Sequence, residues 1–308
     1  NGGAGDLSGM NTIAGGLQNQ ARGNGFGSSG WNSVGGGDQN NANSGTVANT
    51  GGNTIAGGVV NTAFGGGNAN FAGINFVGGG QNNHANGGSG SSSGGNMIGG
   101  GQNNTANGGS STSPGFSGYN TVAGGTGNNA SGDGGDWSGI NTISGGQAHT
   151  ATGSSVFNSG GNTIGGGYFS NASGSTGTVS GYNTIAGGYF NNARGTGTSN
   201  SGLNFIGGGY GNVTTPTGTN IGYNFIGGGS NNFAQLGYST VVGGYSNIIG
   251  AFGHYDFIGG GRNNTANGDA GAGDATVGGG INNNAGGARS VIAGGYFNQA
   301  MGNATTVG

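Results

Sequence analysis

One short pattern recurs sixteen times along the chain, and every copy carries a β-branched aliphatic residue at the same place. With the first residue of a copy numbered 0, position +2 is Ile or Val in all sixteen copies, and positions +4 and +5 are Gly-Gly in all fifteen copies that reach them. Disordered low-complexity sequence has no reason to keep such a register, so the pattern predicts stacked structural repeats. The copies start at Asn11, Asn32, Asn53, Asn75, Asn96, Asn120, Asn141, Asn162, Asn183, Asn204, Asn224, Ser239, Asp256, Ala275, Ser290 and Thr305.

Two further positions are nearly constant, with Asn at +8 and Ala at +10 in thirteen of fifteen copies each. We interpret positions 0 to +3 as a short strand with the +2 side chain pointing inward. Gly-Gly then turns the corner, because glycine reaches positive φ without a Cβ penalty. Positions +6 to +10 are predicted to form a second strand, in which +8 and +10 share the inward face. The Asn side chains at +8 are expected to stack into a ladder of amide hydrogen bonds.

The predicted fold is therefore all-β: a parallel β-solenoid or β-roll of about sixteen turns, with 15 to 24 residues per turn. Residues 1–308 are expected to form a single repeat solenoid, with mostly 21-residue turns over 1–223 and shorter turns of 15 to 19 residues over 224–308. The predicted core ladder is Ile13, Val34, Ile55, Val77, Ile98, Val122, Ile143, Ile164, Ile185, Ile206, Ile226, Val241, Ile258, Val277, Ile292 and Val307. The predicted Asn ladder is Asn19, Asn40, Asn61, Asn83, Asn104, Asn128, Asn191, Asn212, Asn232, Asn247, Asn264, Asn283 and Asn298.

Composition excludes several classes of function. Glycine supplies 89 of 308 residues, only 4% of residues are charged, and the net charge is −3 with four arginines. Nucleic-acid binding needs a basic surface that four scattered arginines do not provide. No cysteine is present, and no apolar stretch is long enough to insert directly into a membrane. Each turn supplies little apolar surface, so a single chain is expected to lack core and to need lateral partners.

The few titratable side chains do not form a recognisable site. The three histidines fall at different repeat positions, and the acidic pairs lie in loop segments, where a solvated turn is the simpler interpretation. We expect no catalytic, metal or cofactor site and no enzymatic activity. The residues weighed for such a site are His84, His149, His254, Asp133, Asp136, Asp269 and Asp274.

Tyrosine follows the register as well. All ten tyrosines fall either directly before a copy, at −1, or at +6, which predicts aromatic rows along the stacked turns. Those at −1 are Tyr119, Tyr182, Tyr223, Tyr238 and Tyr255, and those at +6 are Tyr168, Tyr189, Tyr210, Tyr245 and Tyr296.

Residues 275–287 and 290–302 carry the pattern x-T-V-G-G-G-x-x-N-x-A-x-G or a close variant of it. The pattern resembles the head repeats of YadA-like trimeric autotransporter adhesins, and it is similar to repeats of the same type in phage tail fibres. The resemblance implies a left-handed parallel β-roll, wound as a homotrimer, that binds host or matrix surfaces. It implies an extracellular, cell-surface or virion-fibre location.

The resulting hypothesis is a non-enzymatic structural protein of an extracellular fibre or filament, a surface appendage or adhesin. Its expected partners are copies of itself, joined laterally or head to tail, and host or matrix surface glycans. Residues 305–308 open a copy that then stops, and residues 1–10 match the tail of a copy, so we expect the chain to continue beyond both ends or to stack into a filament.

Three alternatives stay open. A glycan-binding solenoid is one, and a carbohydrate-processing β-helix enzyme is another, although acids and bases are few. The third is an ice-binding solenoid, because Thr occupies +1 in nine copies and a regular row of hydroxyls can match a lattice. The threonines at +1 are Thr12, Thr54, Thr121, Thr142, Thr163, Thr184, Thr240, Thr276 and Thr306.

Overall fold

In a computed structural model the chain divides into two compact units, residues 1–166 and 167–308, and each is described by itself. Every regular element among the described residues is a short β-strand. The expectation of one continuous solenoid over 1–308 stays a prediction. The structure describes residues 9–24, 27, 29–66, 71–89, 92–109, 116–133, 136–153, 157–175, 177–216, 222–250, 252, 254–268 and 273–308.

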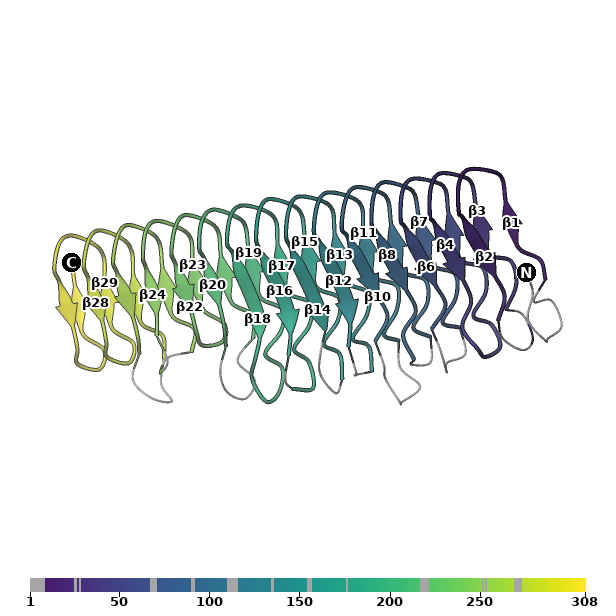
Figure 1. Ribbon diagram of the computed structural model, residues 1–308. Helices are drawn as coiled ribbons and strands as arrows, with labels where there is room; N and C mark the ends of the chain where they lie inside the picture. Colours follow the sequence, from purple (N-terminus) through teal and green to yellow (C-terminus); the bar gives the residue numbers. More distant parts are fainter. Residues whose placement is uncertain are drawn as a thin grey trace. The chain divides into compact units, whose positions relative to one another are not determined.

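The first unit contains two sets of strands that alternate along the chain (Figure 1). One set is β1 (Thr12–Ile13), β3 (Ser33–Val34), β5 (Thr54–Ile55), β7 (Phe76–Val77), β9 (Met97–Ile98), β11 (Thr121–Val122), β13 (Thr142–Ile143) and β15 (Thr163–Ile164). The other is β2 (Gln20–Arg22), β4 (Asn41–Asn43), β6 (Thr62–Phe64), β8 (His84–Asn86), β10 (Thr105–Asn107), β12 (Asn129–Gly132) and β14 (Thr150–Gly153).

The second unit repeats this arrangement. Its odd-numbered strands are β17 (Thr184–Ile185), β19 (Phe205–Ile206), β21 (Phe225–Ile226), β23 (Thr240–Val241), β25 (Phe257–Ile258), β27 (Thr276–Val277), β29 (Val291–Ile292) and β31 (Thr306–Val307). Its even-numbered strands are β16 (Asn171–Gly174), β18 (Asn192–Gly195), β20 (Val213–Thr214), β22 (Phe233–Ala234), β24 (Ile248–Ile249), β26 (Thr265–Ala266), β28 (Asn284–Ala285) and β30 (Gln299–Ala300).

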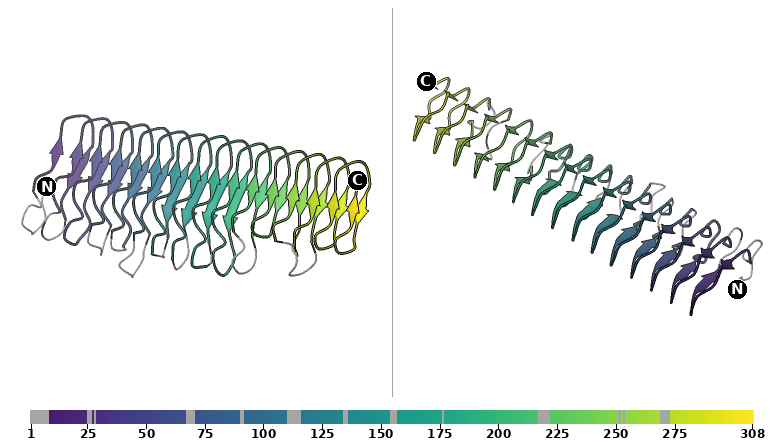
Figure 2. Two further views of the ribbon diagram at one scale, coloured as in Figure 1. Left: turned by 180° about the vertical axis from the view of Figure 1, so that it is seen from behind. Right: turned by 90° about the horizontal axis from the view of Figure 1, so that it is seen from above.

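Within each unit, odd strands pair only with odd strands and even strands with even, always in parallel (Figure 2). Equivalent repeat positions face each other, as Val122 faces Ile143 and Ala106 faces Ala130. Neighbours in a sheet are successive turns, which defines a parallel β-solenoid. The predicted fold class is therefore confirmed, with one odd-numbered strand for each of the sixteen copies.

The +2 side chains lie inside the solenoid. Fourteen of the sixteen are fully buried, and within each unit they lie in register with their equivalents in the neighbouring turns. Ile13 and Val307 remain partly exposed, because the first and last described turns have a neighbour on one side only. Alanines at +10 and most residues at +8 are also buried. Short side chains thus fill the narrow interior that the two sheets enclose, and the expected need for lateral partners stays a prediction.

The Gly-Gly pair turns the chain from an odd strand to the next even strand. Every glycine at +5 whose φ is given lies near +90°, as Gly101 does at 92°. A Cβ on Gly101 would lie well inside van der Waals contact of the Gly125 carbonyl oxygen in the next turn. Glycine is thus required at +5 both for its backbone conformation and for the close approach of successive turns.

The second strand is shorter than predicted. Strands in the even set begin at +9, whereas the sequence predicts a strand from +6 to +10. Position +6 makes only isolated bridges, such as Gln81 to Gln102 and Tyr189 to Tyr210. The residue at +7 interrupts the strand because it adopts positive φ, 57° at Val60 and 55° at Asn103.

The asparagines at +8 hold successive turns together, but they do so through the backbone. Asn104 donates its main-chain N–H to Oδ1 of Asn83 in the preceding turn (3.0 Å). Its Nδ2 donates to the carbonyl oxygen of Gly100 in the same turn and of Gly125 in the next, both at 2.9 Å. The predicted column of asparagines at +8 is present and bonded from turn to turn, but its bonds join side-chain amides to main-chain groups and not to one another.

A true amide ladder lies at position 0, which the sequence interpretation did not single out. Asn120 donates from Nδ2 to Oδ1 of Asn96 (3.0 Å), and Asn141 donates in the same way to Asn120 (2.9 Å). The Nδ2 of Asn120 also lies within hydrogen-bond distance of the carbonyl oxygens of Asn107 (2.8 Å) and Ser117 (3.0 Å). These buried bonds satisfy main-chain groups that solvent cannot reach.

Asp256 occupies position 0 in the second unit and places a carboxyl group in this otherwise uncharged column. The side chain is 1% exposed and accepts hydrogen bonds from the N–H groups of Ala275 (2.8 Å) and Gly268 (3.3 Å). Burial raises the pKa of Asp256 above its ordinary value, and the negative charge of Asp274 acts in the same direction. The two N–H donors and His254 oppose this rise in the pKa without cancelling it.

This carboxyl group predicts a pH-dependent stability. Because the folded-state pKa is raised, the free energy of unfolding falls as pH rises from about 3.9, the ordinary value, to the raised value. Asp256→Asn removes the titrating group and with it this pH-dependent loss of stability. The melting temperature of the variant, relative to that of the parent, should therefore rise between pH 3.5 and pH 7. The rise should be about 2–4 °C for each kcal/mol of unfolding free energy that the parent loses over this range. Thermal melts at several pH values test this, and a constant difference would contradict it.

Candidate functional surface

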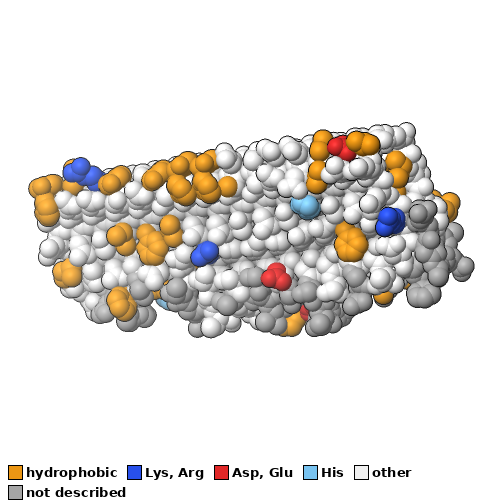
Figure 3. Space-filling model, in the orientation of Figure 1, with side chains coloured by type: hydrophobic (Ala, Val, Ile, Leu, Met, Phe, Trp, Pro, Cys, Tyr) orange, Lys and Arg blue, Asp and Glu red, His pale blue; other side chains and the backbone are white. Residues whose placement is uncertain are grey.

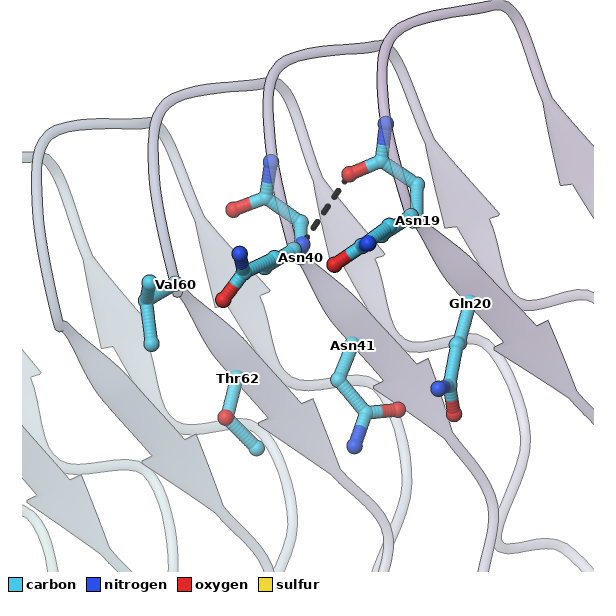
Figure 4. A pocket seen from close by; sticks show the side chains of 8 residues that line it. Asn19, Gln20, Asn40, Asn41, Val60 and Thr62 are labelled. Carbon is cyan, nitrogen blue, oxygen red and sulfur yellow. Dashed lines mark hydrogen bonds between the residues drawn. The ribbon is translucent and has the colours of Figure 1, made fainter.

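Most side chains of the predicted ladders lie in the interior, so a functional surface must be built mainly from outward-facing positions. In the first unit, a groove of about 640 Å³ crosses the first three turns (Figure 4). Its walls carry amide, hydroxyl and aliphatic groups and no charge. The lining residues are Gln18, Asn19, Gln20, Gln39, Asn40, Asn41, Val60 and Thr62.

Local backbone geometry produces this groove. One row of lining residues lies at +7, where the backbone has a positive φ (52° at Gln18 and 54° at Gln39). The other row lies at +9, the first position of each even strand. The +8 side chain between them belongs to the Asn column, and Asn40 donates its N–H to Oδ1 of Asn19 (3.0 Å; Figure 4). Such amide-lined walls offer both donors and acceptors to an uncharged polar ligand.

Farther along the first unit, the same two rows bond to each other. His84 Nε2 lies 3.0 Å from Oδ1 of Asn82, which joins the +9 row to the +7 row. Asn82 in turn donates from Nδ2 to Oδ1 of Asn103 (2.8 Å). His84 is thus a member of a polar surface network of amide side chains.

Aromatic side chains form exposed stacks in the second unit. Tyr168, Tyr189 and Tyr210 at +6 stack with ring centroids 5.0 and 5.4 Å apart and with nearly parallel planes. Phe169 and Phe190 at +7 stack beside them at 5.3 Å. These five residues are named the edge cluster. Patches of hydrophobic side chains are visible on the molecular surface in Figure 3.

Further stacks involve positions −1 and +1. Tyr238 lies between Tyr223 and Tyr255 at −1, at centroid distances of 5.0 and 4.9 Å, and Phe205 stacks on Phe225 at +1 at 5.3 Å. The predicted tyrosine rows are therefore confirmed in these turns. The phenylalanine stacks were not predicted, although Phe at one repeat position in two successive copies was the available signal.

The threonines at +1 form only short rows. Thr121, Thr142 and Thr163 lie in direct register on β11, β13 and β15 and are partly exposed. In the preceding turns of the same sheet the position is taken by Phe76 and Met97, which interrupts the row.

Of the residues weighed for chemistry, the structure brings together His254 and Asp274, whose main-chain groups are hydrogen-bonded (2.9 Å). His149 replaces a +8 asparagine, is fully buried, and donates its main-chain N–H to Oδ1 of Asn128 (3.0 Å). Asp133 donates its main-chain N–H to Gly153, whereas Asp136 bridges to Phe157. His254 and Asp274 lie near Asp256, as described above. Asp269 lies outside the described residues.

No group of three or more His, Cys, Asp or Glu side chains that could hold a metal ion occurs within the described ranges. In the same part of the chain, no helix is long and apolar enough to cross a membrane. Comparison with models of known protein families and with curated proteins finds no match for this chain.

Proposed function

We propose that the protein is a non-enzymatic structural repeat protein of an extracellular fibre or filament, serving as a surface appendage or adhesin, and that copies of it associate laterally. One observation carries the proposal: the interior is already closed within a single chain, yet stacked aromatic side chains remain on the outside. Aromatic stacks that are not needed to fill the core are available for contacts between molecules.

The energetics favour self-association. Burial of one large apolar side chain contributes about 1.5–3 kcal/mol, and contiguous exposed apolar patches mark interaction sites. Tyr189 and Tyr210 of the edge cluster are 39% and 48% exposed. With 4% charged residues there is little repulsion between like chains. The resemblance to trimeric adhesin heads supports a homotrimer, a left-handed winding and an extracellular location as parts of the proposal.

The double variant Tyr189→Ser/Tyr210→Ser tests this proposal. We expect the parent to associate with increasing concentration in sedimentation-velocity experiments. The variant should need at least about tenfold higher concentration to associate to the same extent, because burial of the two rings at an interface contributes more than about 1.4 kcal/mol to the free energy of association. Ile140→Ser, which removes one exposed side chain outside the edge cluster, is the matched control. A parent that stays monomeric at millimolar concentration, without filaments in electron micrographs, would contradict the proposal.

Ice binding is a second candidate because Thr121, Thr142 and Thr163 form an uninterrupted row on one sheet face. Their spacing along the row is that of neighbouring strands, about 4.8 Å. Thermal hysteresis of the purified protein, compared with Thr142→Leu, separates this function from the first: a fibre protein should show none.

A further inference from the structure

A second pocket in the first unit has the shape and lining of a site for a single ring. Its volume is about 220 Å³, and it is lined by Trp31, Asn49, Gly51, Gly52, Phe71 and Ile74. The three large apolar side chains are half exposed or more, at 53% for Trp31, 58% for Phe71 and 68% for Ile74. No charged residue lines the pocket.

The pocket exists because glycine replaces a large residue at position −1. Trp31, Gly52 and Ile74 occupy this position in three successive turns, and each donates its N–H to a carbonyl oxygen of the preceding turn, on Met10, Gly30 and Gly51 respectively. Successive turns are about 4.8 Å apart, so the turns of Trp31 and Ile74 are separated by about 9.6 Å. One ring in van der Waals contact on both of its faces needs about 7–8 Å, so the gap admits a single ring layer.

Another turn of the same unit shows what such a gap accepts. Gly95 also lies at −1, and the ring of Tyr119 from the next turn covers it. Tyr119 Cδ1 and Cε1 lie 2.8 and 2.9 Å from the position that a Cβ on Gly95 would occupy. At Gly52 the nearest atom is Cγ1 of Ile74, at 3.6 Å. The glycine at −1 therefore accepts a ring over it at Gly95, whereas at Gly52 only the smaller, aliphatic Ile74 side chain of the next turn lies in van der Waals range.

We propose that the Gly52 pocket binds one pyranose ring of an uncharged glycan. Its C–H groups would pack on the Trp31 indole and the Phe71 ring, since such aromatic surfaces bury apolar area in specific geometries. Its hydroxyls would bond to the Asn49 amide, which both donates and accepts, and to the glycine backbone. The polar Asn49 favours a sugar over a purely apolar ring. This inference rests on the proposed adhesin function and names its ligand class.

The test uses the two tryptophans of the chain. Trp137→Phe, a substitution that keeps an aromatic ring beside Phe116, leaves Trp31 as the single fluorophore. In this background we expect at least one of cellohexaose, chitohexaose, laminarihexaose and mannohexaose to cause a saturable change in tryptophan fluorescence, with matching heat in titration calorimetry.

Ile74→Tyr should close the pocket without disturbing the turn, because its ring can cover Gly52 as that of Tyr119 covers Gly95. We expect this variant to bind the same oligosaccharide at least tenfold more weakly. Ile140→Tyr introduces the same residue at the same repeat position behind Tyr119, where no glycine gap exists, and should bind like the parent.

Two results would overturn the inference. One is the absence of a saturable response to all four oligosaccharides, and the other is unchanged binding by Ile74→Tyr. Weaker self-association of Ile74→Tyr without any sugar response would instead assign the pocket to a side chain from a second copy. The edge-cluster variant tests the fibre proposal separately, so a failure of sugar binding is distinguishable from a failure of self-association.

Discussion

Gly101→Ala is expected to unfold its part of the solenoid, whereas the neighbouring Gly100→Ala should be nearly silent. Gly101 has a φ of 92°, and an added Cβ would collide with the Gly125 carbonyl oxygen of the next turn and approach Asn104 Nδ2 to 2.7 Å. Backbone and rigid side-chain atoms surround the site, so the collision cannot be relieved locally. We expect a loss of more than about 3 kcal/mol in the free energy of unfolding.

Gly100 provides the control because it precedes Gly101 in the same turn and has no atom within 4 Å of its added Cβ. Its substitution should change the free energy of unfolding by less than about 0.5 kcal/mol, as surface substitutions usually do. Thermal and denaturant unfolding of the two variants compares them directly. An equal loss in the free energy of unfolding at the two positions would contradict this explanation, because it would show that the close approach of the next turn at Gly101 has no effect of its own.

The sequence was sufficient for the core because a single physical requirement selects the residue type. Position +2 must be apolar and suited to a strand, so only Ile and Val occur there, and the structure places them in register. The glycine at +5 is equally readable, since no other residue tolerates both its φ and the approach of the next turn. Strong local constraints leave a visible pattern.

Position +7 shows where such reasoning stops. It adopts positive φ at Val60, Phe190 and Asn103 alike, although β-branched and aromatic residues disfavour that conformation. The surrounding turn and the Asn bonds at +8 impose the geometry, so residue type carries no signal and the strand boundary was misplaced. The Gly52 pocket was missed for a related reason: it depends on which side chains of neighbouring turns cover a glycine.

The two asparagine columns differ in another way. Both are visible in the sequence, but the direction of bonding depends on backbone orientation. At +8 the amide of Asn104 reaches carbonyl groups of two turns, whereas at position 0 the amide of Asn120 reaches the amide of Asn96. Periodicity identifies a column that must be satisfied internally. It does not identify the partner, which is set by how the flanking residues turn the chain.

Ile206→Asp is expected to have the largest effect of a single substitution in the core. Ile206 is fully buried on β19, in register with Ile185 and Ile226 of the neighbouring turns. A carboxylate there would have no polar partner among the +2 side chains, and a buried unpaired charge costs several kcal/mol. Ile206→Val, which removes one methyl group, should cost only about 0.5–1.5 kcal/mol.

The damage from Ile206→Asp should also be local, because each repeat contacts mainly its neighbours. Hydrogen exchange should therefore show lost protection in the turns of Ile185, Ile206 and Ile226 while distant turns of the same unit stay protected. Lowering the pH toward 4 should restore part of the protection, since the buried acid would have a raised pKa and become neutral. Protection lost uniformly through residues 167–308 would mean instead that the second unit unfolds as one cooperative body, and that the stacked turns are coupled well beyond their nearest neighbours.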